Sequence, residues 1–135
     1  MRKDFVISNS IALEGKDYYY DLHNCYSVKE IKFENESHVS KFVFEKAQGD
    51  WISVNNPKTI EIIFIGVSYL ETNNNFFKNL PEDIEEIGYK NEGDFDYDWL
   101  LNEEQSTSQN HFVLRFVNDD YVRIFADEIK VVISL

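Results

Sequence analysis

The sequence predicts an α+β fold, a twisted and mainly antiparallel β-sheet of about six to eight strands with one or two short helices. Apolar and polar residues alternate in several short segments, which is typical of half-buried strands, and turn-forming residues separate these segments. The chain is 43% hydrophobic and has only 5 Gly and 2 Pro among 135 residues, so it can form a core. We expect a single domain spanning residues 1–135.

The first half of the chain contains the clearest strand signals. Residues 28–44 predict a hairpin, because apolar and charged residues alternate on both sides of a polar turn at 35–38. Turn signals flank a short predicted strand at 51–54. Residues 59–70 are apolar on both alternating faces, which predicts a central strand that is covered on both sides.

The second half carries one helix signal followed by more strands. Residues 80–88 predict a short helix with Pro81 in its first turn, acids near its positive end and Gly88 at its C-terminal end. After a polar loop, the C-terminal part predicts a three-strand meander, with strands at 111–117, 121–125 and 129–133.

The net charge of −12 is concentrated in one segment. Residues 82–104 contain ten acidic residues against one base, Lys90, and the rest of the chain is nearly balanced. Such a field repels nucleic acids and anionic membranes and favours basic partners. We therefore expect a basic protein partner and no nucleic acid.

The remaining composition bears on location. The longest apolar run, Ile62–Ile65, is far too short to span a membrane. The first residues contain no apolar core of a signal peptide, and the single cysteine, Cys25, fits a reducing compartment. These features predict a cytoplasmic protein without a membrane association.

The run from 93 to 99 alternates carboxylates with aromatic side chains. In an extended chain the carboxylates would lie on one face and the aromatic rings on the other. Aromatic anchors beside acids suit a protein interface with a basic partner. We predict that the partner-binding residues are Asp94, Asp96, Tyr97, Asp98, Trp99, Glu103 and Glu104.

Two other interpretations of this run remain open. The Asp-x-Asp-x-Asp pattern opens a calcium loop of the EF-hand type, but Trp99 replaces the glycine of the sixth position and Gln105 replaces the glutamate of the twelfth. The run could also be a solvated acidic strand or helix start whose aromatic side chains fill the core.

His23 and Cys25 are the second candidate pair, since an imidazole and a thiol two residues apart lie on the same side of an extended strand. Two ligands are too few for zinc, and no further signature supports a thiol nucleophile. We therefore expect no metal, no cofactor and no catalytic residue.

The order of the elements resembles small bacterial proteins of uncharacterised or immunity type, which are encoded in toxin–immunity loci. The resembling segments are Leu22–Cys25 before a strand, Phe42–Phe44, Ile62–Val67 and the closing hairpin Phe112–Ala126. The resemblance implies an intracellular inhibitor that binds a toxin domain and has no catalytic residues of its own.

Taken together, these observations predict a non-enzymatic protein-binding domain that inhibits a basic, nuclease-type toxin through residues 82–104. One alternative is a small-molecule-binding protein or enzyme with a site in a sheet cavity near His23 and Cys25. Another is a subunit that self-associates through apolar edge strands.

Overall fold

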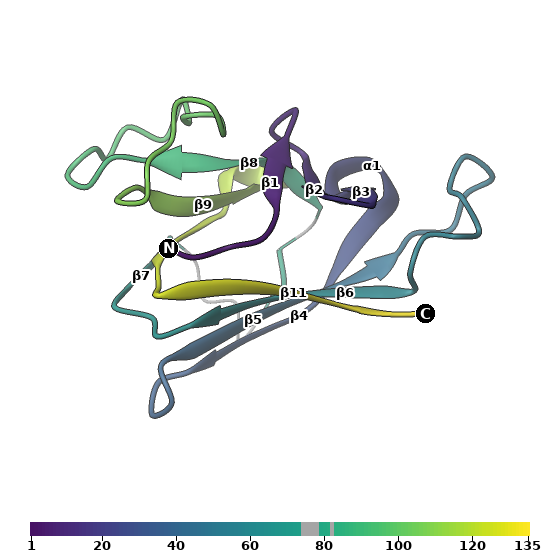
Figure 1. Ribbon diagram of the computed structural model, residues 1–135, viewed down its shortest axis with the longest axis horizontal. Coiled ribbons are helices and arrows are strands. Elements are labelled where there is room, and N and C mark those ends of the chain that lie inside the picture. The colour runs from purple at the N-terminus through teal and green to yellow at the C-terminus, as the bar shows by residue number, and fades with distance from the viewer. Residues whose placement is uncertain (74–78, 82) are drawn as a thin grey trace.

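The computed structural model describes residues 1–73, 79–81 and 83–135, and it arranges eleven described strands in three antiparallel sheets (Figure 1). The N-terminal sheet has the order β1-β2-β3 and comprises β1 (Val6–Ser8), β2 (Ala12–Gly15) and β3 (Tyr18–Asp21). A sheet of order β11-β6-β5-β4 comprises β4 (Tyr26–Glu34), β5 (Val39–Lys46), β6 (Thr59–Ile65) and β11 (Glu128–Ser134). A sheet of order β7-β10-β9-β8 comprises β7 (Tyr69–Thr72), β8 (Ile84–Lys90), β9 (His111–Phe116) and β10 (Tyr121–Phe125).

Helical structure is sparse among the described residues. A four-residue helix, α1 (Leu22–Cys25), follows β3, and a 3-10 turn, η1 (Val117–Asp119), joins β9 to β10. The mainly antiparallel fold is therefore confirmed, and the strands are more numerous than predicted. No helix in the described part of the chain is long and apolar enough to cross a membrane.

The two four-stranded sheets pack face to face around an aromatic core (Figure 1). Alternating residues of β6 point into this core, and Phe64 is fully buried. Its ring lies 5.5 Å from the ring of Phe42 in the same sheet and 5.4 Å from that of Phe112 in the opposite sheet. Tyr89 continues the series, 5.5 Å from Phe112. Such edge-to-face contacts tie the two sheets together.

The predicted hairpin at 28–44 is confirmed by β4 and β5. The predicted strand at 59–70 is confirmed only in part. It ends at Ile65, where Gly66 adopts a φ of 72° and would overlap Asp127 if it carried a Cβ. The chain then enters the opposite sheet as β7, and β6 is fully buried on one face only.

The predicted strand at 51–54 is wrong. These residues form turns, in which Ile52 donates to the Gly49 carbonyl and Asn56 to that of Ser53. Ile52 is buried between exposed neighbours, which imitates the alternation of a strand. The preceding strand pairs directly with the following one, β5 with β6, and this segment only connects them.

The predicted helix at 80–88 is also wrong, because Ile84–Lys90 forms β8; Glu82 lies outside the described residues. The pairing of β8 with β9 shifts between Ile84 and Glu86, which is a β-bulge. The extra residue places Ile84 and Ile87 on the same buried face although they are three positions apart. This spacing imitates the stripe of a helix.

All three predicted C-terminal strands are present, as β9, β10 and β11, but only the first two pair as predicted. β9 and β10 form the predicted hairpin, but after the buried residue Ala126 the chain crosses to the other sheet. There β11 pairs with β6, so the last strand belongs to the opposite layer.

Candidate functional site

Residues 91–101 form a strap that crosses the outer face of the sheet β7-β10-β9-β8, the face turned away from the aromatic core. The strap leaves the end of β8 and returns beside it, where Tyr89 and Leu101 exchange backbone hydrogen bonds of 3.0 and 2.8 Å. Figure 1 shows the loops that follow β8 lying beyond β8 and β9, on the far side from β11. The strap contains five of the seven residues predicted to bind a partner.

Arg123, on β10, is the main anchor of the strap, and it is fully buried. Its Nη2 donates to the carbonyl of Asn91 at 2.9 Å, and its Nη1 donates to the carbonyl of Asp94 and to the Tyr97 hydroxyl. Its Nε donates to Nδ1 of His111 at 2.8 Å. Burial and the neighbouring guanidinium lower the pKa of His111, so its Nδ1 accepts as part of a neutral ring.

Three tyrosines converge on Glu71, beside this guanidinium. The hydroxyls of Tyr69 and Tyr121 donate to its carboxylate at 2.5 Å, and that of Tyr97 donates at 2.9 Å. Burial alone would raise the pKa of Glu71, but these three donors hold it below its usual value. The hydrogen bond between Tyr69 and Glu71 in turn raises the pKa of Tyr69 to about 12. The ring of Tyr97 stacks on that of Tyr121 at 4.1 Å, which joins the strap to β10.

Lys90 is the second buried cation beneath the strap. Its Nζ lies 3.2 Å from the centre of the Trp99 ring and 3.7 Å from a carboxylate oxygen of Asp94. Burial lowers the pKa of this ammonium, while Asp94 opposes that shift. Arg115 adds a third cation, which donates to the Tyr97 carbonyl at 2.9 Å. Lys90, the only base in residues 82–104, thus holds Trp99 in place.

The strap is not an extended strand, so its acids and aromatic residues do not separate onto two faces as they would in one. The amide of Asp96 donates to the carboxylate of Asp94 at 3.0 Å, and the amide of Asp98 donates to that of Asp96 at 3.0 Å. Aspartate side chains that accept from the backbone two residues later bend the chain into turns. The alternating acids therefore determine the local shape of the strap.

The outward side of the strap combines exposed aromatic rings with exposed carboxylates. Phe95 is 60% exposed and Trp99 is 43% exposed, although the other side of each ring contacts a buried cation. Asp96 and Asp98 are exposed beside them. We call these four residues the strap surface.

Glu103 and Glu104 lie apart from the strap surface, in the turn that follows it. Glu103 turns inward and accepts from Lys3 at 3.0 Å, from the Ile7 amide at 2.8 Å and from the Tyr89 hydroxyl at 2.6 Å. It therefore attaches β1 to the rest of the fold. Glu104 is exposed and lines a shallow hollow of 510 Å³ beside β1.

Gly88 allows the strap to return close to β8. A Cβ at this position would lie 2.7 Å from the Leu101 carbonyl oxygen and 2.8 Å from Cβ of Leu100. We expect Gly88→Ala to lower the free energy of unfolding by about 1–3 kcal/mol, because the backbone of the strap must shift. Thermal unfolding would measure this cost, and an unchanged midpoint would show that the close approach is not needed.

His23 and Cys25 lie on α1 and not on an extended strand. The His23 Nδ1 donates to the Ile84 carbonyl at 2.5 Å, which leaves only its other nitrogen for further contacts. Burial, together with Asp21, raises the pKa of Cys25, which disfavours the reactive thiolate. Among the described residues no group of three or more potential ligands could hold a metal ion.

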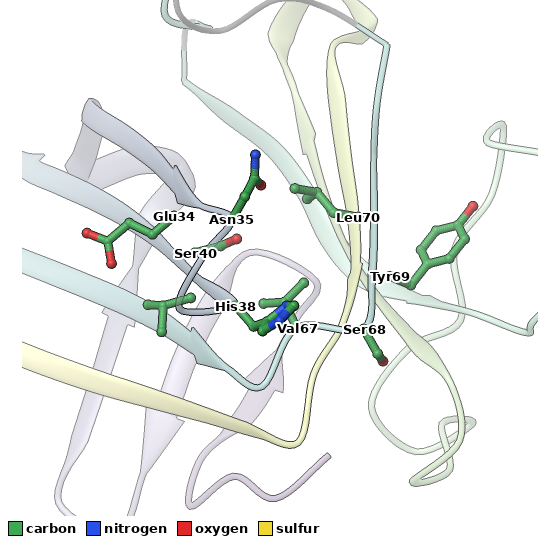
Figure 2. Close-up of a pocket in the computed structure, with 9 residues that line it drawn as sticks. Glu34, Asn35, His38, Ser40, Val67, Ser68, Tyr69 and Leu70 are labelled. Atoms are coloured by element: carbon green, nitrogen blue, oxygen red, sulfur yellow. The ribbon is translucent and has the colours of Figure 1, made fainter.

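A small hollow lies where the turn between β4 and β5 meets the chain that enters β7 (Figure 2). Asn35 and Leu70 point into it from opposite sides, whereas Tyr69 points away. Its volume is 160 Å³, which is below the roughly 300 Å³ at which ligand pockets begin. His23 and Cys25 do not line it.

The sequence prediction missed the residues that position the strap, Arg123, His111, Glu71 and Lys90. The sequence did contain one signal that a segment covers this sheet. Arg115 and Arg123 are basic residues within strands whose other positions are mostly apolar. A basic residue in such a strand needs a partner above the sheet, and here the strap supplies it.

Comparison of the chain with family models, with curated proteins and with solved structures gives no match in any of the three.

Proposed function

We propose that this protein is a non-enzymatic binding domain that docks a basic protein through the strap surface. The observation that carries the proposal is the exposure of Phe95 and Trp99 on a segment held from beneath by the fully buried Arg123 and Lys90. Neither ring is part of the apolar core, aromatic side chains are enriched at protein interfaces, and Trp is among the residue types most enriched in binding hot spots.

The way the strap is held favours tight binding. The guanidinium of Arg123 and the turns formed by Asp94 and Asp96 fix the backbone before any partner arrives. A surface that is ordered in advance loses less conformational entropy on association. The strap surface thus combines aromatic anchors with a backbone that does not need to fold on binding.

The charge of the strap surface favours a basic partner. The carboxylates of Asp96 and Asp98 are exposed, and they lie in the segment that carries most of the net charge of −12. Electrostatic potentials of opposite sign on two proteins accelerate their association and make its rate sensitive to salt. A nuclease-type toxin domain fits this requirement, because its phosphate-binding groups would accept carboxylates in place of substrate. Inhibition of such a toxin would also agree with the resemblance to immunity-type proteins.

We expect Trp99→Ala to weaken partner binding about thirtyfold, as for an aromatic hot spot. The matched control is Trp51→Ala, because Trp51 is 70% exposed but lies outside the strap. A photoreactive residue at position 95 would capture the partner, and surface plasmon resonance would then compare the variants. Equal affinities for both variants would contradict binding through the strap surface.

The electrostatic part of the proposal has a separate test. The association rate should fall steeply from low to high salt, and Asp96→Lys with Asp98→Lys should remove most of this dependence. A nuclease partner should also be displaced by a short oligonucleotide. An association rate that does not change with salt, or a complex that binds the oligonucleotide as well, would contradict the proposal of phosphate mimicry.

A further inference from the structure

We propose that the free edge of β11 is a site for a second copy of this chain, which adds its own β11 in the antiparallel direction to form one continuous sheet of eight strands. This inference is independent of the strap surface, which lies on the other four-stranded sheet. It rests on the unpaired backbone of β11, on the residues of this edge and on the register that they permit.

β11 is an edge strand whose outer side is covered only at its start. The Arg2 amide donates to the Asp127 carbonyl at 2.9 Å, and the Ile129 amide donates to the Arg2 carbonyl at 2.8 Å. Beyond Ile129, no described segment pairs with this side of the strand. Because alternate residues of a strand point their backbone groups to opposite sides, Val131 and Ile133 direct theirs outward like Ile129.

The two edges of this sheet differ in how they resist association. The edge strand β4 contains a bulge after Val28 and carries charged residues along its length. Such features protect edges from pairing with other chains. Residues 131–135, in contrast, contain no charged side chain, no proline and no glycine. Of the ten exposed large hydrophobic side chains among the described residues, three lie here: Val132, Ile133 and Leu135.

If the pairing is confined to residues 130–134 of β11, one register uses both free donors of this edge. Pairing about a twofold axis at Val132 places Val131 opposite Ile133 of the second copy and Val132 opposite its own equivalent. Lys130 then lies opposite Ser134 of the second copy, so no like charges face each other. A shift of the axis to Val131 would bring the second copy against Arg2, and a shift to Lys130 would oppose two lysines.

The composition of the edge also favours a second copy over a charged partner. Most of the net charge of −12 resides in residues 83–104, on or beside the other sheet, so the edge of β11 is where two such acidic chains can approach. Apolar pairing between chains of like net charge should strengthen as salt screens their repulsion. This dependence is opposite to that expected for the strap surface.

Variants that introduce a positive or a negative charge at position 132 test the proposal, with sedimentation equilibrium as the measurement. We expect a wild-type dimer that Val132→Lys and Val132→Glu each weaken about tenfold or more, because each variant opposes like charges across the twofold axis. An equal mixture of the two variants should regain the dimer. The control is Val43→Lys, since Val43 lies in the same cross-strand row on the same face but two strands inside the edge.

Amide hydrogen exchange provides a second measurement that needs no substitution. The amides of Val131 and Ile133 should exchange more slowly as protein concentration rises, while that of Val132, bonded to β6, should not change. A wild-type chain that remains monomeric at every concentration would overturn the proposal. So would a mixture of charge variants that stays monomeric, or a Val43→Lys variant that loses the dimer equally.

Discussion

Replacing Arg123 with Met is expected to lower the free energy of unfolding by about 3–5 kcal/mol and to release the strap. The substitution removes the fully buried guanidinium that donates to the carbonyls of Asn91 and Asp94 and to Nδ1 of His111. It also leaves the carboxylate of Glu71 without its neighbouring cation. Equilibrium unfolding in denaturant would measure the loss.

Arg123→Lys is the matched control for charge. Lysine keeps the cation but lacks the planar fork that reaches four acceptors at once, so it should recover only part of the lost stability. Amide exchange at Asp96 and Asp98 would report the strap itself, and we expect it to accelerate in both variants. A strap that keeps its protection in Arg123→Met would contradict the role of the guanidinium as an anchor.

Glu103→Ala is the second prediction with a large effect, about 2–4 kcal/mol of unfolding free energy. The side chain accepts from Lys3, from the Ile7 amide and from the Tyr89 hydroxyl, and these donors would lose their partner. Glu104→Ala is the control, because that neighbour is exposed. Equal stability of the two variants would contradict a structural role for Glu103.

The same carboxylate should make stability depend on pH. Burial alone would raise the pKa of Glu103, but the Tyr89 hydroxyl, the Ile7 amide and the Lys3 ammonium together lower it. The folded state therefore favours the charged form. The stabilisation is complete above the ordinary glutamate pKa of about 4.3 and is lost as the pH falls through the lower folded value. The stability difference between wild type and Glu103→Gln should shrink over that window.

The sequence predicted the parts of the candidate site that depend on neighbouring residues, and it missed the parts that depend on residues distant along the chain. The acids and aromatic residues of 93–99 were identified from the sequence, and Asp96, Asp98 and Trp99 are exposed. The direction of each side chain was not identified, because contacts with Arg123 on β10 decide how the turns of this segment lie on the sheet. Glu103 and Glu104 are adjacent acids that the sequence alone does not distinguish. Glu103 is nevertheless hydrogen-bonded within the fold, whereas Glu104 is exposed.

The errors in the fold have a similar origin. Ile84 and Ile87 have the spacing of a helical stripe because a bulge inserts one residue into β8, and only the pairing with β9 reveals the bulge. Gly88 was interpreted as a helix end, but it is required because the Leu101 carbonyl approaches the strand. Both features arise from segments that are distant along the chain.

The sequence by itself determined the antiparallel β-structure, the hairpin at 28–44, the paired strands β9 and β10, and the concentration of acid in residues 82–104. These follow from local alternation and composition, which act through neighbouring residues. The tertiary structure alone decided that the last strand joins the opposite sheet and that buried cations hold the acidic strap from beneath. Both depend on which faces meet, because burial of apolar side chains and desolvation of charges are settled only when separate segments pack together.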